Sequence, residues 1–332
     1  MESRTKRRTF IKGAGMAALT AAGWIPIRDS LGGEPVPYSS GTEAPKLKVP
    51  ANACDCHMHI YDSRFPIAPS ATLRPPDASV SDYRMLQKRI GTARNVVVQP
   101  STYGTDNRCT LDAVAQIGPT ARAVAVVDTT VSDAELQRLA GLGVRGIRFN
   151  LVQAGATTTD MLEPLSKRVN ELGWHVQIHM LGDQIVQIED ILQRLPTPIV
   201  FDHMGRLPLP AGVDHPAFRV IGKLLEKGNT WVKLSGAYMN TKVGPPTYAD
   251  VRELMQAYVK AAPERMVWAT DWPHPTIKEN ENKPDDAVML DLLLASVPDE
   301  RTRNAILVRN PEVLYGFSTR AELRNTANRI VE

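Results

Sequence analysis

Residues 53–61, ACDCHMHIY, place two histidines two positions apart inside an apolar run. The chain has only seven histidines in 332 residues, so the pair calls for an explanation. If this stretch is a β-strand, alternation puts His57 and His59 on one face together with Asp55, and the cysteines on the other. Two imidazoles on one face indicate either a metal or catalytic site or a pair that only packs. The rest of the chain has to distinguish these two interpretations.

Seven further short runs rich in β-branched residues come after this stretch, and amphipathic segments separate most of them. Strands that alternate with helices imply βαβ units and a parallel sheet. Eight such units predict a single (β/α)8 TIM barrel. A doubly wound open sheet is the alternative, but no glycine-rich phosphate turn comes after the first strand. A last helix is expected over about 299–316, after predicted strands at 53–60, 95–101, 121–128, 144–150, 175–180, 198–205, 230–237 and 266–272.

The predicted strands begin with apolar residues and end with polar ones. In a (β/α)8 barrel the C-terminal ends of all strands form one mouth, and the active sites of this fold lie there. Side chains far apart in sequence would therefore meet in one pocket. These residues are His57, His59, Gln99, Ser101, Arg148, Asn150, His179, Asp202, His203, Ser235 and Asp271. By contrast, His175 begins its strand and His215 lies in a loop, so both are predicted to be structural.

Composition argues against several classes of protein. Lysine and arginine total 39 against 36 acidic residues, and part of the net charge of +3 comes from a basic cluster at residues 4–8. The remainder is nearly neutral, which argues against a nucleic-acid binder or a membrane-surface protein. Three cysteines do not make a disulfide framework, and Cys54 and Cys56 are predicted to pack as small core residues. Whether the protein forms a homo-oligomer is not decided by the composition.

Residues 1–45 differ in composition from the rest of the chain. The stretch TKRRTFIKGAGMAALTAAGW (5–24) has a basic start, twin arginines, a mildly apolar run and a small-residue cleavage site. It resembles a twin-arginine export signal, and a disordered basic tail is the alternative. We therefore expect a periplasmic protein, with the cytoplasm as the alternative. The expected organisation is a signal and linker over 1–45, a hydrolase barrel over 46–318 and a tail over 319–332.

Five motifs together resemble the amidohydrolase superfamily, specifically its amidohydrolase-2 branch and the 2-pyrone-4,6-dicarboxylate lactonase group within it. The paired histidines and the strand-eight aspartate are shared across the superfamily. The combination of DHMGR with TDWPHP is more specific to the lactonase branch. The resemblance covers about residues 51–317, and its motifs are DCHMHIYD (55–62), VRGIRFN (144–150), VQIHM (176–180), DHMGR (202–206) and TDWPH (270–274).

The resemblance implies an activity. His57, His59 and His203 would polarise a lactone carbonyl, directly or through a metal, because charge develops on that oxygen in the transition state. Asp271 would take a proton from the attacking water. The expected function is a hydrolase that opens an anionic lactone from aromatic degradation, such as 4-sulfomuconolactone. The alternatives are a lactone isomerase of the galactarolactone type, a metal-dependent decarboxylase of the same branch and, in another class, an exported solute-binding protein.

The resemblance also implies a metal site. Its ligands would be His57, His59, His179 and Asp271, with His203 nearby as a ligand or electrophile. Imidazole and carboxylate ligands with an open position suit Zn²⁺. Binuclear members carry a carboxylated lysine on strand four, where this chain offers arginine, and this argues against two metals. We expect one zinc ion, and metal-free catalysis is the alternative.

Two arginines bear on the substrate. Arg148 lies on the inward face of strand four, and Arg206 comes just after the predicted strand six. Guanidinium groups bind carboxylate or sulfonate oxygens in bidentate fashion, so a small anionic lactone is the expected partner. Ordinary ion pairs are the alternative for both arginines. The residues expected to donate or accept hydrogen bonds with the substrate are Ser101, Tyr103 and Tyr238.

Overall fold

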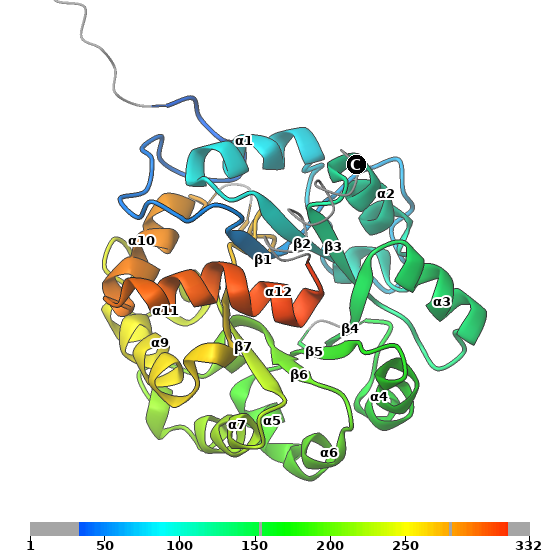
Figure 1. Ribbon diagram of the computed structural model, residues 1–332. Coiled ribbons are helices and arrows are strands. Elements are labelled where there is room, and N and C mark those ends of the chain that lie inside the picture. Colours follow the sequence, from blue (N-terminus) through cyan, green and yellow to red (C-terminus); the bar gives the residue numbers. More distant parts are fainter. Residues whose placement is uncertain (1–32, 153–154, 279–280, 318–332) are drawn as a thin grey trace, which may run out of the picture. The chain divides into compact units, whose positions relative to one another are not determined.

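The computed structural model describes residues 33–152, 155–278 and 281–317, and within them the predicted (β/α)8 barrel is confirmed (Figure 1). The strands succeed one another around an eight-stranded sheet in chain order, and every neighbouring pair is parallel. The strands are β1 (Cys54–Met58), β2 (Arg94–Val98), β3 (Ala121–Ala125), β4 (Val144–Asn150), β5 (His175–His179), β6 (Ile199–Phe201), β7 (Thr230–Leu234) and β8 (Met266–Trp268).

The sheet closes through main-chain hydrogen bonds between β1 and the residues that come after β8. The amide of Asp271 donates to the carbonyl of His57 at 2.8 Å, and the amide of His59 donates to the carbonyl of Trp272 at 2.8 Å. A closed ring of strands excludes the doubly wound open sheet. The closure also places the paired histidines directly beside the strand-eight aspartate.

Helices surround the strands in Figure 1. Polar caps begin several of them: Ser79 forms a capping box with Asp82, and Ser132 accepts from the amide of Glu135. The helix expected over 299–316 is present as α11, a π-helical turn and α12. The α-helices are α1 (Val80–Ile90), α2 (Arg108–Ile117), α3 (Asp133–Gly141), α4 (Leu162–Asn170), α5 (Gly182–Gln187), α6 (Glu189–Arg194), α7 (Pro216–Glu226), α8 (Ala237–Asn240), α9 (Ala249–Ala261), α10 (Asp286–Ser296), α11 (Glu300–Asn304) and α12 (Asn310–Tyr315).

The predicted directions of the β1 side chains are only partly right. Its pairing with β2 shifts register between Asp55 and Met58, which is a β-bulge or similar irregularity. Cys54 and Cys56 pack inside the barrel with valines of the other strands, whereas Asp55 accepts a hydrogen bond from Tyr83 of the surrounding α1 at 3.0 Å. A bulge breaks strict alternation, so an additional side chain can turn inward. His57 and His59 therefore face the barrel mouth, as predicted, but Asp55 does not accompany them.

Two histidines predicted to be structural lie away from the barrel mouth. His175 packs edge-on against Tyr315, with ring centroids 5.4 Å apart. His215 precedes α7 and its Nδ1 accepts a hydrogen bond from the amide of Ala217 at 3.2 Å.

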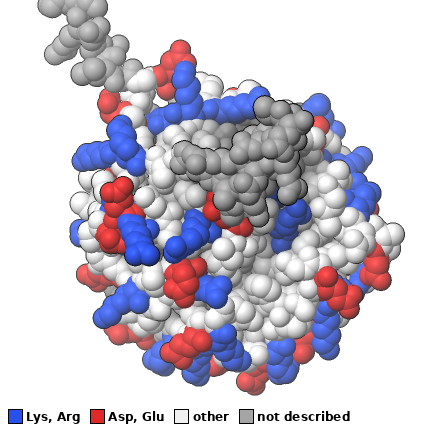
Figure 2. All heavy atoms as spheres, in the orientation of Figure 1, with Lys and Arg blue, Asp and Glu red and all other residues white. Residues whose placement is uncertain are grey.

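The segment before β1 packs on the barrel. The indole nitrogen of Trp272 donates to the carbonyl of Pro37 at 2.8 Å, and Tyr38 packs edge-on against the same indole ring. The export signal and the C-terminal tail lie outside the described residues, which include only residues 33–45 of the predicted signal and linker. The domain boundaries stay predictions. Among the described helices, none has the length and apolar character that crossing a bilayer requires. Basic and acidic side chains are interspersed over the face shown in Figure 2.

Candidate active site

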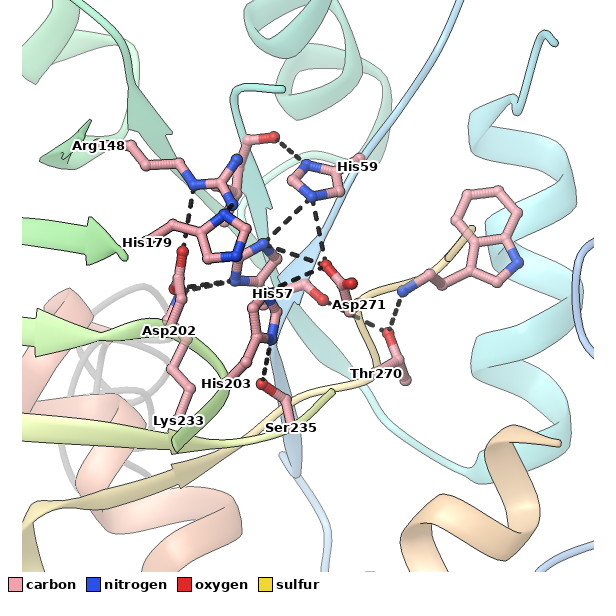
Figure 3. Close-up of polar contacts among 12 residues, drawn as sticks. His57, His59, Arg148, His179, Asp202, His203, Lys233, Ser235, Thr270 and Asp271 are labelled. Atoms are coloured by element: carbon pink, nitrogen blue, oxygen red, sulfur yellow. Dashed lines mark hydrogen bonds and ion pairs between the residues drawn. The ribbon is translucent and has the colours of Figure 1, made fainter. Parts of the chain in front are cut away.

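Four of the predicted residues meet at the C-terminal mouth of the barrel (Figure 3). The Nε2 atoms of His57 and His59 lie 3.2 Å apart, and each lies 3.4 Å from Oδ1 of Asp271. His203 directs its Nε2 at the same oxygen from 3.7 Å. All four side chains are buried. We call His57, His59, His203 and Asp271 the His–Asp cluster.

Strained backbone holds two members of the cluster in place. Asp271 has φ of +65° and His203 has φ of +50°, values that non-glycine residues rarely adopt. Such conformations persist where the surrounding structure enforces them, and they concentrate at functional sites. Gly236 contributes because a Cβ at that position would lie 2.9 Å from the ring of His203. Only glycine lets the chain after β7 pass this close to the imidazole.

Hydrogen bonds to the outer ring nitrogens orient two of the imidazoles. Nδ1 of His59 lies 2.7 Å from the carbonyl oxygen of Val98, which only accepts, so this nitrogen carries the proton. The lone pair of His59 is therefore on Nε2 and faces Asp271. Nδ1 of His203 lies 2.9 Å from the hydroxyl of Ser235. Both contacts leave Nε2 as the atom that faces the cavity.

A buried ionic network lies behind His57. Asp202 approaches Nδ1 of His57 through Oδ1 at 3.1 Å, and its Oδ2 accepts from Nε of Arg148 at 3.1 Å and from Gln177 at 3.1 Å. Lys233 donates to Oε1 of Gln177 at 2.7 Å. Neither Lys233 nor Gln177 was predicted from the sequence. The available signal was a lysine within the apolar strand TWVKL, because a lysine buried in a strand is rare unless it is paired.

Burial sets the protonation states of the cluster. It lowers the pKa of His57 well below the ordinary value and that of His203 to about 4. Burial alone would raise the pKa of Asp271, but the neighbouring imidazoles of His203, His59 and His57 outweigh it, so that this pKa falls well below its usual range. At neutral pH the imidazoles of His57 and His203 are therefore neutral and face the carboxylate of Asp271.

His179 lies beside the cluster but faces arginines. Its Nδ1 is 3.4 Å from Nη2 of Arg148, and its Nε2 is 3.3 Å from Nη1 of Arg206. Guanidinium groups only donate, so they compete with a metal ion for the single lone pair of a neutral imidazole. The structure thus brings together three of the four predicted metal ligands and sets the fourth apart. The ligand role of His179 stays a prediction.

A divalent cation fits the His–Asp cluster. Ligand atoms of His57, His203 and Asp271 lie within 4.8 Å of one another, and His59 adjoins them. When the Nδ1 proton of His57 points to Asp202, the lone pairs of His57, His59 and Asp271 converge with no proton among them. Imidazole nitrogens and a carboxylate oxygen are the ligands of catalytic sites with an open position. The cluster is therefore a possible His–His–Asp metal site.

A small cavity lies over the cluster. Its volume of about 20 Å³ has room for about one water molecule. Leu73, Met239 of α8 and Pro275 lie in its wall, so the cavity has to widen before a lactone can bind. Tyr61 also lines the cavity, and it was not predicted from the sequence although it continues the alternation of His57 and His59. The other lining residues are His59, Pro100, Ser101, Arg148, Asn150, His179, His203, Asp271 and Thr276.

The predicted substrate-binding residues separate into three positions. Ser101 and Arg148 line the cavity. Arg206 contacts His179 and Oδ1 of Asn240, and it is not part of the cavity wall. The hydroxyl of Tyr103 donates to the main-chain carbonyl of Asp62 at 3.2 Å and accepts from its amide at 2.8 Å. The structure therefore brings Ser101 and Arg148 to the cavity, whereas Tyr103 orders the loop after β1.

Tyr238 contacts the carboxylate of the cluster. Its hydroxyl donates to Oδ2 of Asp271 at 2.6 Å, which leaves Oδ1 to face the imidazoles. We expect Tyr238→Phe to lower kcat about tenfold with little change in KM, because a hydrogen bond to a charged group contributes about 1.5–3 kcal/mol. Steady-state kinetics measure both constants. Tyr248→Phe, a buried tyrosine outside the cavity wall, is the matched control. Equal losses in the two variants would contradict a specific role for Tyr238.

The fold and the site define a class of enzyme. A (β/α)8 barrel whose C-terminal mouth gathers histidines from β1 and after β6 around an aspartate after β8 is the arrangement of an amidohydrolase-type hydrolase. The chain belongs to the amidohydrolase family, whose model matches residues 54–317. The resemblance seen in the motifs is confirmed.

Relatives of known activity are lactone enzymes. The chain is 38% identical to a 2-pyrone-4,6-dicarboxylate hydrolase of Comamonas testosteroni, over 82% of this chain and 92% of that protein. It is 34% identical to a D-galactarolactone isomerase of Agrobacterium fabrum, over 84% and 96%. It is also 34% identical to a 4-sulfomuconolactone hydrolase of Rhizobium radiobacter, over 81% and 91%. A crystal structure from Agrobacterium tumefaciens, 33% identical, matches 85% of this chain and 99% of its own with a TM-score of 0.78.

Proposed function

We propose that the protein is a lactone hydrolase that opens an anionic lactone, such as 4-sulfomuconolactone or a carboxylated lactone from aromatic degradation. The observation that carries this proposal is the carboxylate of Asp271, held within 3.7 Å of three imidazoles at a cavity that Arg148 lines. Relatives at 34–38% identity that hydrolyse such lactones support the substrate class.

The geometry supports hydrolysis through general-base catalysis. Asp271 accepts a proton from the water that attacks the lactone carbonyl carbon. When the hydroxyl of Ser235 donates to Nδ1 of His203, Nε2 of His203 carries the proton and would donate a hydrogen bond to the carbonyl oxygen as it gains charge. The bond between the carbonyl carbon and the ring oxygen then breaks, and the proton held by Asp271 passes to that oxygen. Hydrolysis consumes one water and yields one hydroxy acid.

Zinc is the cofactor that we propose for the cluster. His57, His59 and Asp271 would hold it, with His203 or His179 as a further ligand. A bound zinc ion polarises a carbonyl oxygen and lowers the pKa of bound water to about 7. The same side chains without metal still offer a base and hydrogen-bonding imidazoles, so metal-free catalysis is the alternative. Metal analysis of the purified protein, together with activity after chelation, separates the two.

A lactone isomerase is the second candidate, because a relative at 34% identity is a D-galactarolactone isomerase. In that reaction a substrate hydroxyl would replace water as the nucleophile. Turnover in ¹⁸O-labelled water distinguishes the two reactions. We expect one labelled oxygen in the carboxylate of the product, whereas an unlabelled isomeric lactone would overturn hydrolysis. Release of CO₂ would instead indicate a decarboxylase.

Export through the twin-arginine pathway remains a proposal that rests on residues 5–24. A periplasmic location would result from it, and the cytoplasm is the alternative. Replacing Arg7 and Arg8 by lysine is expected to retain the protein in the cytoplasm, and cell fractionation measures this.

A further inference from the structure

Lys233 is a buried lysine that the proposed reaction does not use. Its side chain is fully buried in β7, and its ammonium group contacts Nδ1 of His57, whereas Nε2 of the same ring faces Asp271 (Figure 3). Three acceptors surround its ammonium group: Oε1 of Gln177 at 2.7 Å, Nδ1 of His57 at 3.2 Å and Oδ1 of Asp202 at 3.4 Å. An ammonium group has three protons and no lone pair, so it can serve all three.

The contacts of Lys233 and Asp202 with Nδ1 of His57 require opposite protonation states of that nitrogen. Asp202 lies 3.1 Å from Nδ1 and accepts a hydrogen bond only if this nitrogen carries the proton. Lys233 lies 3.2 Å from Nδ1 and donates only if this nitrogen carries the lone pair. A neutral imidazole has one proton, so it can satisfy one of the two contacts. The choice determines whether Nε2 offers a lone pair or a proton to His59 and Asp271.

The contact between His57 and His59 favours one tautomer of His57 in the metal-free protein. The lone pair of His59 is on Nε2, because its Nδ1 donates to Val98. The contact of 3.2 Å between the two Nε2 atoms is therefore a hydrogen bond only when His57 carries its proton on Nε2. Nδ1 of His57 then accepts from Lys233. In the opposite tautomer two imidazole lone pairs and the Asp271 carboxylate face one another unprotonated, a repulsive arrangement that a divalent cation would relieve.

We propose that His57 is a tautomeric switch set by Lys233 and Asp202. Lys233 holds the proton on Nε2, which closes the His–Asp cluster to a metal ion, and Asp202 draws the proton to Nδ1, which opens it. Lys233 is thus a positioning residue that weakens metal binding, and this inference rests on the zinc site of the proposed function.

Nitrogen NMR of histidine-labelled, metal-free protein tests the switch directly, with the His57 signals assigned by their loss in His57→Asn. We expect the proton of His57 on Nε2 in the metal-free protein and on Nδ1 after one equivalent of Zn²⁺. In metal-free Lys233→Met the proton is expected on Nδ1. A proton on Nδ1 in the metal-free wild type overturns the proposal, and so does a proton that stays on Nε2 in Lys233→Met. The wild-type measurement decides even if the variant does not fold.

Zinc affinity gives a second readout, measured by competition with a chromophoric chelator. We expect Lys233→Met to bind zinc about tenfold more tightly than the wild type and Asp202→Asn about tenfold more weakly, within the range that outer-sphere partners of metal ligands produce. Lys223→Met, which replaces an exposed lysine of α7, is the matched control. Affinity in Lys233→Met equal to or weaker than that of the wild type contradicts the proposal. Neither experiment uses a lactone, so its outcome is independent of whether the protein hydrolyses one.

Discussion

Asp271→Asn is expected to lower kcat for the lactone by about 100- to 10,000-fold, the range that a positioned general base contributes. Asparagine has the same shape, but its amide does not take a proton from water. The carboxylate of Asp271 faces three imidazoles and the hydroxyl of Tyr238, and an amide can satisfy only part of these contacts. Steady-state kinetics measure the loss, and circular dichroism with thermal unfolding checks that the barrel remains folded.

A matched control for this variant is Asp286→Asn. Asp286 is also fully buried and lies 3.1 Å from a histidine, His274, but it is not part of the cavity wall. We expect near-normal kcat from this control. Near-normal kcat in Asp271→Asn itself would remove the proposed base.

Arg148→Ala is expected to raise KM for an anionic lactone about 10- to 100-fold while changing KM for a neutral lactone little. The guanidinium lines the cavity, and a charge-assisted hydrogen bond contributes about 1.5–3 kcal/mol. Kinetics with a matched pair of charged and neutral lactones measure the difference. Equal effects on the two substrates would contradict the anion-binding role.

The same variant is expected to reduce the free energy of unfolding by about 3 kcal/mol, because removing one partner of a buried ion pair leaves the remaining charge less well compensated. Asp202 would lose the donor at 3.1 Å and retain the more distant Lys233 at 3.4 Å. Urea unfolding measures this change. Arg145→Ala is the control, since Arg145 lies on the same strand and, among the described residues, its Nη1 donates to the main-chain carbonyls of Ala140 and Val144 and to no carboxylate.

Local patterns carried much of the information about the fold. Short β-branched runs alternate with amphipathic ones, and each predicted strand overlaps an observed one. The polar strand ends predicted the convergence of His57, His59, His203 and Asp271, because the strands of a (β/α)8 barrel share one C-terminal mouth. Periodicity and residue type are properties of neighbouring positions, so they can be read without knowing the pairing of strands.

The side-chain contacts that surround the His–Asp cluster could not be predicted from local sequence patterns. Lys233 comes from β7 and Asp202 from the end of β6, and they meet His57 because the barrel stacks inward side chains of different strands at one level. The positions of Tyr103 and Tyr238 depend on loop paths that periodicity does not encode. Tyr103 therefore orders a loop, and Tyr238 contacts Asp271 instead of lining the cavity.

By itself, the sequence determined the barrel and the convergence of His57, His59, His203 and Asp271 at its mouth, because strand period and strand-end polarity are local. Only the tertiary structure decided which way those side chains face. The register shift in β1 turned Cys54 and Cys56 inward and Asp55 outward, and an arginine lies beside each ring nitrogen of His179. Register and stagger between strands arise from contacts across the closed barrel, and no single stretch of sequence records them.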